Sequence, residues 1–417
     1  MTKKDAVIVY GAGISGRGAA QVLADRKQQV YLYNDMDCTL EPQLLQLLES
    51  VGGGLAIGQA AFEGLLDIAG VLVLSPGIAC DNANVLLAEQ RGLEVISEVE
   101  LGYRLYGGHI AAITGTNGKT TTTTIVGEML KRLPEPSAVG GNIGLALSKE
   151  VESLPQDGWL AAELSSFQLE KVSSFCPDIA VVLNLTPDHL ERHHTMEAYG
   201  EAKKNIFRQQ GEVQVTVLNY DDPIVRTWGA ETKGRLCYFS RKEKLQQGIY
   251  MQDGNFIISW DGKQETVCNI SELHLFGGHN EENVLAAIAC GFFAGVSISD
   301  MADVLRNFRS IEHRIEYVAT IDGVPYYSKA TNTDSTIKAL EAFKDGHIIL
   351  LAGGHDKLTP LEPMMELVKE KTDALILLGA AKERFNKAAF ACGVQNIVLA
   401  DSFEDAVSKA HSMAHKP

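Results

Sequence analysis

The stretch Ile113-Thr114-Gly115-Thr116-Asn117-Gly118-Lys119-Thr120-Thr121 decides the fold expected for this chain. An apolar, strand-like run precedes it at 109–114, and a helical pattern follows at 121–133. Backbone amides of such a glycine loop cradle phosphates, its lysine reaches the terminal phosphates, and a threonine hydroxyl binds Mg²⁺. Only Thr116 and Asn117 separate the two glycines, so the loop departs from the general pattern with four intervening residues. The stretch predicts a strand–loop–helix unit that binds a nucleoside triphosphate.

A second glycine loop, Gly11-Ala12-Gly13-Ile14-Ser15-Gly16, follows the apolar run 6–10. It opens a helical stretch, and Asp35 stands at the end of the next expected strand. Glycines for a tight turn, a helix N-terminus for a pyrophosphate and a carboxylate for a ribose make up a dinucleotide-binding fingerprint. These residues select a diphosphate ligand but not a nicotinamide. Taken alone, they are as consistent with NAD or FAD as with another diphosphate ligand or with a tight turn that has only a structural role.

The composition is that of an ordinary soluble globular protein. Of the 417 residues, 45% are hydrophobic and 22% charged, and 37 Lys and Arg against 53 Asp and Glu give a net charge of −16. This balance argues against binding to nucleic acid. No run is long and apolar enough to span a membrane, and the 7 scattered cysteines indicate a reducing compartment. We expect a cytoplasmic protein.

The order of expected elements predicts an α/β fold of three domains. Strand-like and helical stretches alternate from the N-terminus, which favours parallel sheets. We expect domains at 1–97, 98–310 and 311–417: a Rossmann-like domain, a central P-loop ATPase-type domain with a small extra β-sheet, and a second Rossmann-like domain. The extra sheet is expected within 213–275, where Asp253-Gly254 predicts a hairpin turn.

Later segments add acidic, histidine and lysine candidates for a nucleotide–metal site. Glu163 ends an apolar run, where a carboxylate is able to ligate Mg²⁺, and Asp188-His189 follows another such run. His189 and His193 stand four apart, as in some zinc sites, but no further ligand has suitable spacing. Lys203-Lys204 taken alone has the pattern of a solvated helix face.

Together these segments resemble the Mur ligase family. The resemblance is carried by residues 115–120, by Glu163-Leu164-Ser165-Ser166-Phe167-Gln168-Leu169, by residues 188–193 and by Gly278-His279-Asn280-Glu281-Glu282-Asn283. The shortened glycine loop is itself that family's form. His313-Arg314, residues 328–332 and residues 353–357 extend the resemblance, which covers essentially the whole chain in family order.

The resemblance implies a role for individual residues at matching positions. Those implied to hold a UDP-sugar are Gly13, Ile14, Ser15, Asp35, Ser75, Gly77 and Asn142. Those implied to hold ATP are Gly115, Thr116, Asn117, Gly118, Lys119, Thr120, Thr121, Asn280, Asn283 and Arg314. The implied Mg²⁺ ligands are Thr120, Glu163, His189 and Lys203, the last as a carbamate. Lys329, Thr331 and Lys357 match the region that receives the amino acid, and Lys119, His189 and Lys203 are the implied catalytic residues.

The implied activity is ATP-dependent amide synthesis in peptidoglycan precursor and cell-wall biogenesis, and hence in cell shape and division. The first glycine loop, with residues 75–78 and 97–101, is similar to that of members that add D-glutamate to UDP-N-acetylmuramoyl-L-alanine through an acyl phosphate. The implied cofactors are ATP and Mg²⁺, and we expect a monomer. Alternatives are a sister ligase for another amino acid, a nicotinamide-dependent oxidoreductase and a non-catalytic nucleotide-binding regulator.

Two departures from the family pattern concern the third domain. The pattern has Asn-Asp before Ser328-Lys329, where this chain has Tyr326-Tyr327. The pattern also continues beyond His415-Lys416-Pro417 with a further strand and a loop that grips the glutamate side chain. We therefore expect a truncated third domain.

Overall fold

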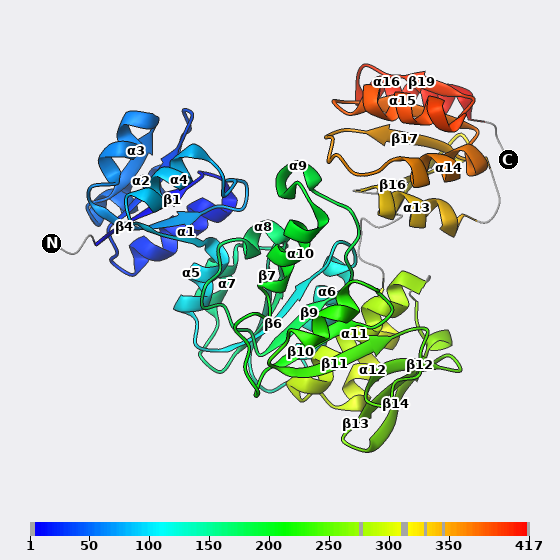
Figure 1. The fold of residues 1–417 in the computed structure, drawn as a ribbon, viewed down its shortest axis with the longest axis horizontal. Helices are drawn as coiled ribbons and strands as arrows, with labels where there is room; N and C mark the ends of the chain where they lie inside the picture. The colour runs from blue at the N-terminus through cyan, green and yellow to red at the C-terminus, as the bar shows by residue number, and fades with distance from the viewer. Residues whose placement is uncertain (1–4, 275–277, 310–315, 329–331, 344–346, 415–417) are drawn as a thin grey trace. The chain divides into compact units, whose positions relative to one another are not determined.

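The computed structural model describes residues 5–274, 278–309, 316–328, 332–343 and 347–414 (Figure 1). The chain folds into two compact units. Unit 1 comprises Met1–Leu185 and Gly200–Phe308, and unit 2 comprises Thr186–Tyr199 and Arg309–Pro417. Both units are built from sheets and helices, which confirms the predicted α/β class.

The N-terminal part of unit 1 is a parallel sheet of five strands in the order β3-β2-β1-β4-β5. Its strands are β1 (Ala6–Tyr10), β2 (Val30–Asn34), β3 (Gly54–Ile57), β4 (Ala69–Leu74) and β5 (Glu94–Ser97). Its helices are α1 (Ile14–Asp25), α2 (Pro42–Ser50), α3 (Gln59–Leu65), α4 (Ala83–Gln90) and α5 (Glu98–Leu105).

Helices cover both faces of this sheet, which explains why β1 is apolar at every position. Ala6, Ile8 and Tyr10 pack into a core with residues of α3 and α4. Val7 and Val9 point to the other face, where they join residues of α1 and α2. Successive side chains of a strand alternate between faces, so a strand buried on both sides reads as a continuous hydrophobic run.

The rest of unit 1 is built on a sheet of nine strands in the order β14-β13-β12-β11-β10-β9-β6-β8-β7. The strands are β6 (His109–Thr114), β7 (Ser137–Gly141), β8 (Trp159–Glu163), β9 (Ile179–Val182), β10 (Val215–Asn219), β11 (Arg235–Ser240), β12 (Gly248–Gln252), β13 (Asn255–Trp260) and β14 (Lys263–Asn269). The helices are α6 (Lys119–Leu130), α7 (Leu147–Ser153), α8 (Ser166–Leu169), α10 (Met196–Lys204, which begins in unit 2), α11 (Gly278–Ala294) and α12 (Ile298–Asn307), with 3₁₀ turns at Val225–Ala230 and Ile270–Glu272.

The extra strands expected within 213–275 are antiparallel and extend the edge of the central sheet. β12 pairs with β11 in parallel, and β13 and β14 then pair antiparallel. The turn between β12 and β13 is Asp253-Gly254, as predicted, and both residues have positive φ, 52° and 76°. Two positive φ values are what the tightest two-residue hairpin loops require.

Unit 2 contains a hairpin and a parallel sheet of three strands in the order β17-β18-β19. Its strands are β15 (Glu316–Ile321), β16 (Val324–Ser328), β17 (Ile349–Gly353), β18 (Ala374–Leu378) and β19 (Ile397–Leu399). Its helices are α9 (Leu190–His193), α13 (Thr333–Ala342), α14 (Glu362–Lys371), α15 (Lys382–Cys392) and α16 (Phe403–Met413). Residues of α14 and α15 pack on one face of β18 and residues of α16 on the other.

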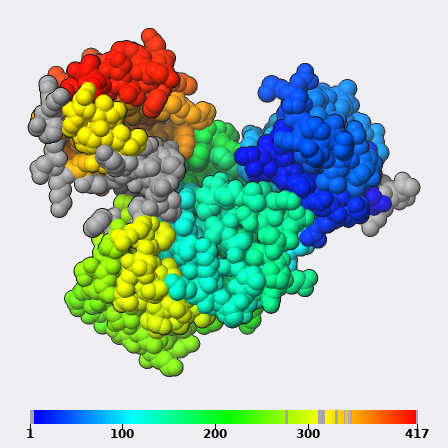
Figure 2. Space-filling view, turned by 180° about the vertical axis from the view of Figure 1, so that it is seen from behind, coloured from blue at the N-terminus to red at the C-terminus, as the bar shows by residue number. Residues whose placement is uncertain are grey.

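Figure 2 shows α16 (red) on the surface of unit 2, where Phe403 is exposed. Over the part of the chain that the structure describes, every helix is too short or too polar to cross a membrane.

Candidate functional site

The predicted phosphate-binding loop connects β6 to α6 in unit 1. Gly118 has φ +88°, and a Cβ placed there would lie 2.2 Å from Oδ1 of Asn283. Both the backbone conformation and the available space therefore require glycine. Asn283 is buried and accepts a hydrogen bond from the Thr122 hydroxyl, and its amide donates to Oδ1 of Asn280. The two predicted ATP residues of α11 are thus linked, and Asn283 lies against the loop.

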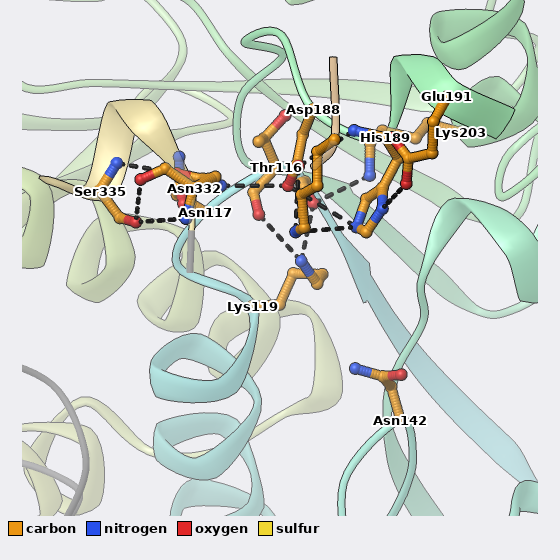
Figure 3. Close-up of polar contacts among 12 residues, drawn as sticks. Thr116, Asn117, Lys119, Asn142, Asp188, His189, Glu191, Lys203, Asn332 and Ser335 are labelled. Atoms are coloured by element: carbon orange, nitrogen blue, oxygen red, sulfur yellow. Dashed lines mark hydrogen bonds and ion pairs between the residues drawn. The ribbon is translucent and has the colours of Figure 1, made fainter. Parts of the chain in front are cut away.

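Lys119 folds back onto this loop. Its Nζ donates to the carbonyl oxygens of Gly115, at 3.0 Å, and Thr116, at 2.9 Å (Figure 3). A lysine amine held at the main chain of a glycine loop is placed to reach phosphate oxygens that the loop amides would bind. The residue predicted to neutralise phosphoryl charge therefore lies in the loop.

Asn184, which the sequence analysis did not single out, braces the same loop. Its Oδ1 accepts from the amide of Asn117 at 2.8 Å, its Nδ2 donates to the carbonyl of Asn117 at 3.1 Å, and its own carbonyl accepts from the amide of Thr116 at 3.1 Å. Asn184 follows β9, the neighbour of β6 in the sheet. A polar residue just beyond the carboxyl end of a parallel strand was the one available signal for this role.

Glu163 ends β8 beside Ile113 of β6. Its Oε1 accepts from Nδ2 of Asn142 at 2.9 Å, whereas its buried Oε2 has no hydrogen-bond partner among the residues that the structure describes. A buried carboxylate oxygen without a partner is costly unless a cation compensates it, and Mg²⁺ prefers oxygen ligands. The residues here fit the predicted magnesium ion.

Lys203, on α10, is almost completely buried, at 1% exposure. Its Nζ lies 2.9 Å from the carbonyl oxygen of Gly115 and 3.5 Å from Oγ1 of Thr114. The pattern of a solvated face, which the Lys203-Lys204 pair suggested in isolation, therefore fails for Lys203. The lysine is instead part of the phosphate-loop cluster.

The N-terminal glycine loop of unit 1 connects β1 to α1. Ser75 donates its hydroxyl to the carbonyl of Gly11 at 3.0 Å, and a Cβ on Gly16 would lie 1.8 Å from the same carbonyl oxygen. Only glycine allows helix and loop to approach so closely. Gly13 is the N-cap of α1 and is exposed, as are Ile14 and Gly77, whereas Ser75 is buried and braces the loop.

A second group of polar residues lies within unit 2. Oδ1 of Asp188 lies 3.1 Å from Nζ of Lys357, and its Oδ2 accepts from Nδ2 of Asn332 at 3.0 Å. His189 lies with Nδ1 3.3 Å from Oε1 of Glu191 and Nε2 3.4 Å from Nζ of Lys357 (Figure 3). The predicted residues His189 and Lys357 are therefore brought together, with Asp188, Asn332 and Glu191 as contacts that the prediction did not assign.

The backbone and the charge state of His189 are both unusual. Its φ of 54° is in the left-handed region, which residues other than glycine seldom adopt and which is enriched at functional sites. Burial lowers the pKa of the imidazole, Lys357 acts in the same direction, and Asp188 and Glu191 oppose it. A lowered pKa favours the neutral imidazole, which is the form that binds metals.

The zinc alternative finds no support in this geometry. His189 precedes α9 as its N-cap, and the His193 ring packs against Tyr199, with 5.2 Å between ring centroids. The two histidines therefore do not share a helix face. Within the described ranges, no group of three or more His, Cys, Asp or Glu side chains is placed to hold a metal ion. Arg314, Lys329 and Thr331 lie outside the described residues.

Comparisons with known proteins complete the description of the site. The profile of the Mur ligase middle domain matches residues 113–291, and that of the Mur ligase, glutamate ligase domain matches residues 313–417. The chain belongs to the Mur ligase family. This confirms the resemblance seen in the sequence and, with the folds of solved relatives, the arrangement in three domains.

Relatives of this Mur ligase with about 40% identity have one name in common. UDP-N-acetylmuramoylalanine–D-glutamate ligase of Thermoanaerobacter sp. (strain X514) is 39% identical over 414 residues, which are 98% of this chain and 90% of the relative. The protein of that name from Lachnoclostridium phytofermentans is 40% identical over 404 residues, 96% of this chain and 88% of the relative.

Solved structures of other Mur ligases share the fold at low identity. MurF from Acinetobacter baumannii superposes with a TM-score of 0.61 at 16% identity and covers 98% of this chain and 86% of its own. A pseudomurein peptide ligase type C from Methanothermus fervidus gives a TM-score of 0.60 at 19% identity and covers 99% and 95%. These likenesses establish the fold alone.

Proposed function

We propose that this Mur ligase joins D-glutamate to UDP-N-acetylmuramoyl-L-alanine at the expense of ATP, as a step of peptidoglycan precursor synthesis. The observation that carries the proposal is the cluster around Gly115, where Lys119 and Lys203 both contact one carbonyl oxygen. Glu163 ends the strand beside β6, and within the described part of the chain one of its buried oxygens has no hydrogen-bond partner. Such a cluster suits phosphoryl transfer from a nucleoside triphosphate.

The chemistry begins with activation of a carboxylate, which is a poor electrophile. The L-alanyl carboxylate oxygen attacks the γ-phosphorus of ATP, the bond from phosphorus to the bridging oxygen breaks, and ADP leaves with an acyl phosphate formed. Lys119 is placed to neutralise charge that develops on the phosphoryl oxygens. Mg²⁺, held by Glu163 and Thr120, would supply further charge neutralisation when bound.

The second half of the reaction forms the amide bond. The amine of D-glutamate attacks the acyl carbon, a tetrahedral intermediate forms, and inorganic phosphate leaves as the amine loses a proton. We assign Lys357 and His189 to the side of the reaction that handles the amino acid, since the two side chains meet beside Asp188 in unit 2. Lys357 offers a cation for a substrate carboxylate.

The UDP-sugar belongs in this proposal to the N-terminal glycine loop. That loop has a helix N-terminus at Gly13 and Asp35 directly after β2, which suits a nucleoside diphosphate. No observation favours a nicotinamide. We further propose a monomer that acts in the cytoplasm on these two substrates, without nucleic acid or membrane.

A sister ligase for another amino acid is the second candidate, because the same fold occurs in Mur ligases with other names. The relatives at about 40% identity favour D-glutamate. The test is mass spectrometry of the product from ATP, Mg²⁺ and UDP-N-acetylmuramoyl-L-alanine, with D-glutamate, L-glutamate, L-lysine or meso-diaminopimelate in separate reactions. Adduct with D-glutamate alone supports the proposal. Adduct with another amino acid selects the sister ligase, and ATP binding with no adduct indicates a regulator.

A further inference from the structure

Asp35 is the exposed end of a hydrogen-bonded cluster whose other members lie inside the N-terminal sheet of unit 1. Tyr10, the last residue of β1, donates its hydroxyl to Oδ2 of Asp35 at 2.6 Å. Tyr33, in β2, donates to Oδ1 at 2.8 Å. The two tyrosines are 0% and 1% exposed, whereas Asp35 is exposed. Each carboxylate oxygen therefore accepts from one buried phenol, while the aspartate itself is exposed.

The phenol rings are fixed in place by packing. Tyr10 and Tyr33 meet edge to face with 4.9 Å between centroids, and Phe62 lies against both, at 6.0 Å and 4.7 Å. The amide of Asn84 adds contacts of 3.2 Å to the Tyr33 hydroxyl and to Oδ1 of Asp35. A cluster tied together in this way fixes the plane of a surface carboxylate that would otherwise rotate.

Both phenols keep their protons at neutral pH. Burial, followed by the hydrogen bond to Asp35, raises the pKa of Tyr10 to about 12. The same two causes raise the pKa of Tyr33. The hydroxyls are therefore donors and the carboxylate is the acceptor. Phenylalanine would fill the same space, so the hydroxyls add hydrogen bonds: the two shortest go to Asp35, and weaker ones join Tyr10 to Asn82 and Tyr33 to Asn84.

The glycine loop beside Asp35 is held just as firmly. Oδ1 of Asn34 accepts from the amide of Ala12 at 3.2 Å, and its Nδ2 donates to the carbonyl of Met36 at 2.8 Å. Nε of Arg17 donates to the carbonyl of Ala12 at 2.8 Å. Asn34 thus ties the loop to the residues on either side of Asp35, and the carboxylate has a set position relative to the loop.

We propose that Tyr10 and Tyr33 are positioning residues that preset Asp35 as an acceptor for a hydrogen-bond donor on the nucleoside of the UDP-sugar. The inference rests on the proposed function, in which this glycine loop holds that substrate. An ionised carboxylate only accepts hydrogen bonds, so it selects a ribose hydroxyl or the N–H of a uracil and disfavours an acceptor or an anion. Presetting removes the cost of ordering the carboxylate when the ligand binds.

The test uses Tyr10→Phe, Tyr33→Phe and the double variant, with Tyr31→Phe as the matched control. Tyr31 lies in β2, as Tyr33 does, but its hydroxyl donates to the carbonyl of Gly52 and not to Asp35. The dissociation constant of UDP and the KM values for UDP-N-acetylmuramoyl-L-alanine and ATP are measured, with kcat. We expect each single variant to weaken UDP binding about threefold to tenfold and the double variant about 30-fold, since each hydroxyl contributes one charge-assisted hydrogen bond.

A purely structural role would lower thermal stability and all kinetic constants together. The positioning role changes the KM for the UDP-sugar and leaves kcat and the KM for ATP within about a factor of two. UDP affinity equal to that of Tyr31→Phe, in a folded double variant, overturns the inference. If the double variant does not fold, Asp35→Asn, at an exposed position, is measured in its place, and unchanged affinity overturns the inference in the same way.

Two ligand analogues identify the donor that Asp35 accepts from. If the donor is the ribose 2′-hydroxyl, 2′-deoxy-UDP binds wild type more weakly than UDP and the double variant loses no further affinity for it. If the donor is the uracil N–H, N3-methyl-UDP behaves in this way instead. If the wild-type protein does not bind UDP at all, the proposed function itself is contradicted. That result differs from unchanged UDP affinity in the tyrosine variants, which contradicts only the positioning role.

Discussion

Nζ of Lys203 lies 2.9 Å from the carbonyl oxygen of Gly115, the residue that begins the phosphate-binding loop. Nζ of Lys119 lies 3.0 Å from the same oxygen. One main-chain carbonyl oxygen therefore lies within hydrogen-bond distance of the Nζ atoms of two lysines. Both amines therefore lie at the main chain of the loop that is proposed to hold the phosphates of ATP. This relationship ties both lysines to phosphate chemistry.

Replacing Lys119 by methionine keeps the length of the side chain and removes its charge. We expect kcat to fall at least about 100-fold, because the developing phosphoryl charge loses its nearest cation. Lys131→Met is the matched control: Lys131 caps the other end of α6 and pairs with Glu128 on the surface. Equal kcat in the two variants would show that Lys119 has no part in the reaction.

Lys203 and Lys204 are neighbours with opposite expected behaviour. Lys203→Met removes a buried group that contacts the phosphate loop, so activity is expected to fall about 100-fold or more. Lys204 pairs with Glu201 and Glu231, and Lys204→Met is expected to change activity less than about threefold. Initial rates of both variants under saturating substrates check this. A similar loss of activity in both variants would mean that the substitutions act by destabilising α10 and not through the phosphate loop.

Glu163→Gln tests the proposed magnesium site. Glutamine keeps an oxygen that accepts from Asn142 and removes the negative charge, so the Mg²⁺ concentration for half-maximal activity is expected to rise at least about tenfold. The melting temperature without nucleotide is expected to stay level or rise, because a buried charge without a partner on one oxygen is lost. An unchanged Mg²⁺ titration would contradict the assignment.

Asn184→Ala removes the brace of the phosphate loop. We expect the KM for ATP to rise about tenfold, since two side-chain hydrogen bonds that hold Asn117 are lost. Asn205→Ala is the control, because its amide makes one bond to the carbonyl of Leu169 elsewhere in unit 1. The control is expected to lower stability without a change in the KM for ATP. A normal KM in Asn184→Ala would mean that the loop holds its shape without the brace.

Glu100 is expected to make the stability of the fold depend on pH, in a direction that follows from its lowered pKa. Burial alone would raise its pKa, but hydrogen bonds from Ser174, Ser173 and Arg104 outweigh burial and lower it. A lowered folded pKa means that the stabilisation is present above the unfolded pKa and is lost as pH falls through the folded value. Glu100→Gln is therefore expected to cost about 2–3 kcal/mol near pH 7.

The cost of Glu100→Gln should shrink progressively as the pH is lowered below the ordinary carboxyl value of 4.5. Urea unfolding at a series of pH values measures this dependence. Glu128→Gln, at an exposed surface pair, serves as the control with little effect at any pH. If the loss of unfolding free energy in Glu100→Gln did not depend on pH, the charge of Glu100 would not be what stabilises the fold.

Features that depend on local chemistry were predictable from the sequence. The glycines at 115 and 118 with Lys119 predicted a phosphate loop between a strand and a helix, and Asp253-Gly254 predicted a hairpin; the structure has both elements. Each prediction needed only the backbone freedom of glycine or the preference of a tight turn. Such rules act over a few residues and do not require knowledge of the tertiary fold.

Features that depend on long-range packing were not predictable. Asn184 is separated from Asn117 by 67 positions, and Tyr10 from Asp35 by 25. The unusual φ of His189 likewise has no signature in its neighbours along the chain. Lys203 gave a misleading local signal, because a Lys-Lys pair on a helix reads as solvated until the sheet that buries one of them is known.

The proposed reaction consumes ATP, UDP-N-acetylmuramoyl-L-alanine and D-glutamate together. Its most direct measurement is the release of inorganic phosphate from ATP and Mg²⁺, with UDP-N-acetylmuramoyl-L-alanine and D-glutamate present together and each omitted in turn. We predict rapid release only when both are present, with one amide formed per phosphate. Release that does not require D-glutamate, or no release from a protein that binds ATP, would contradict it.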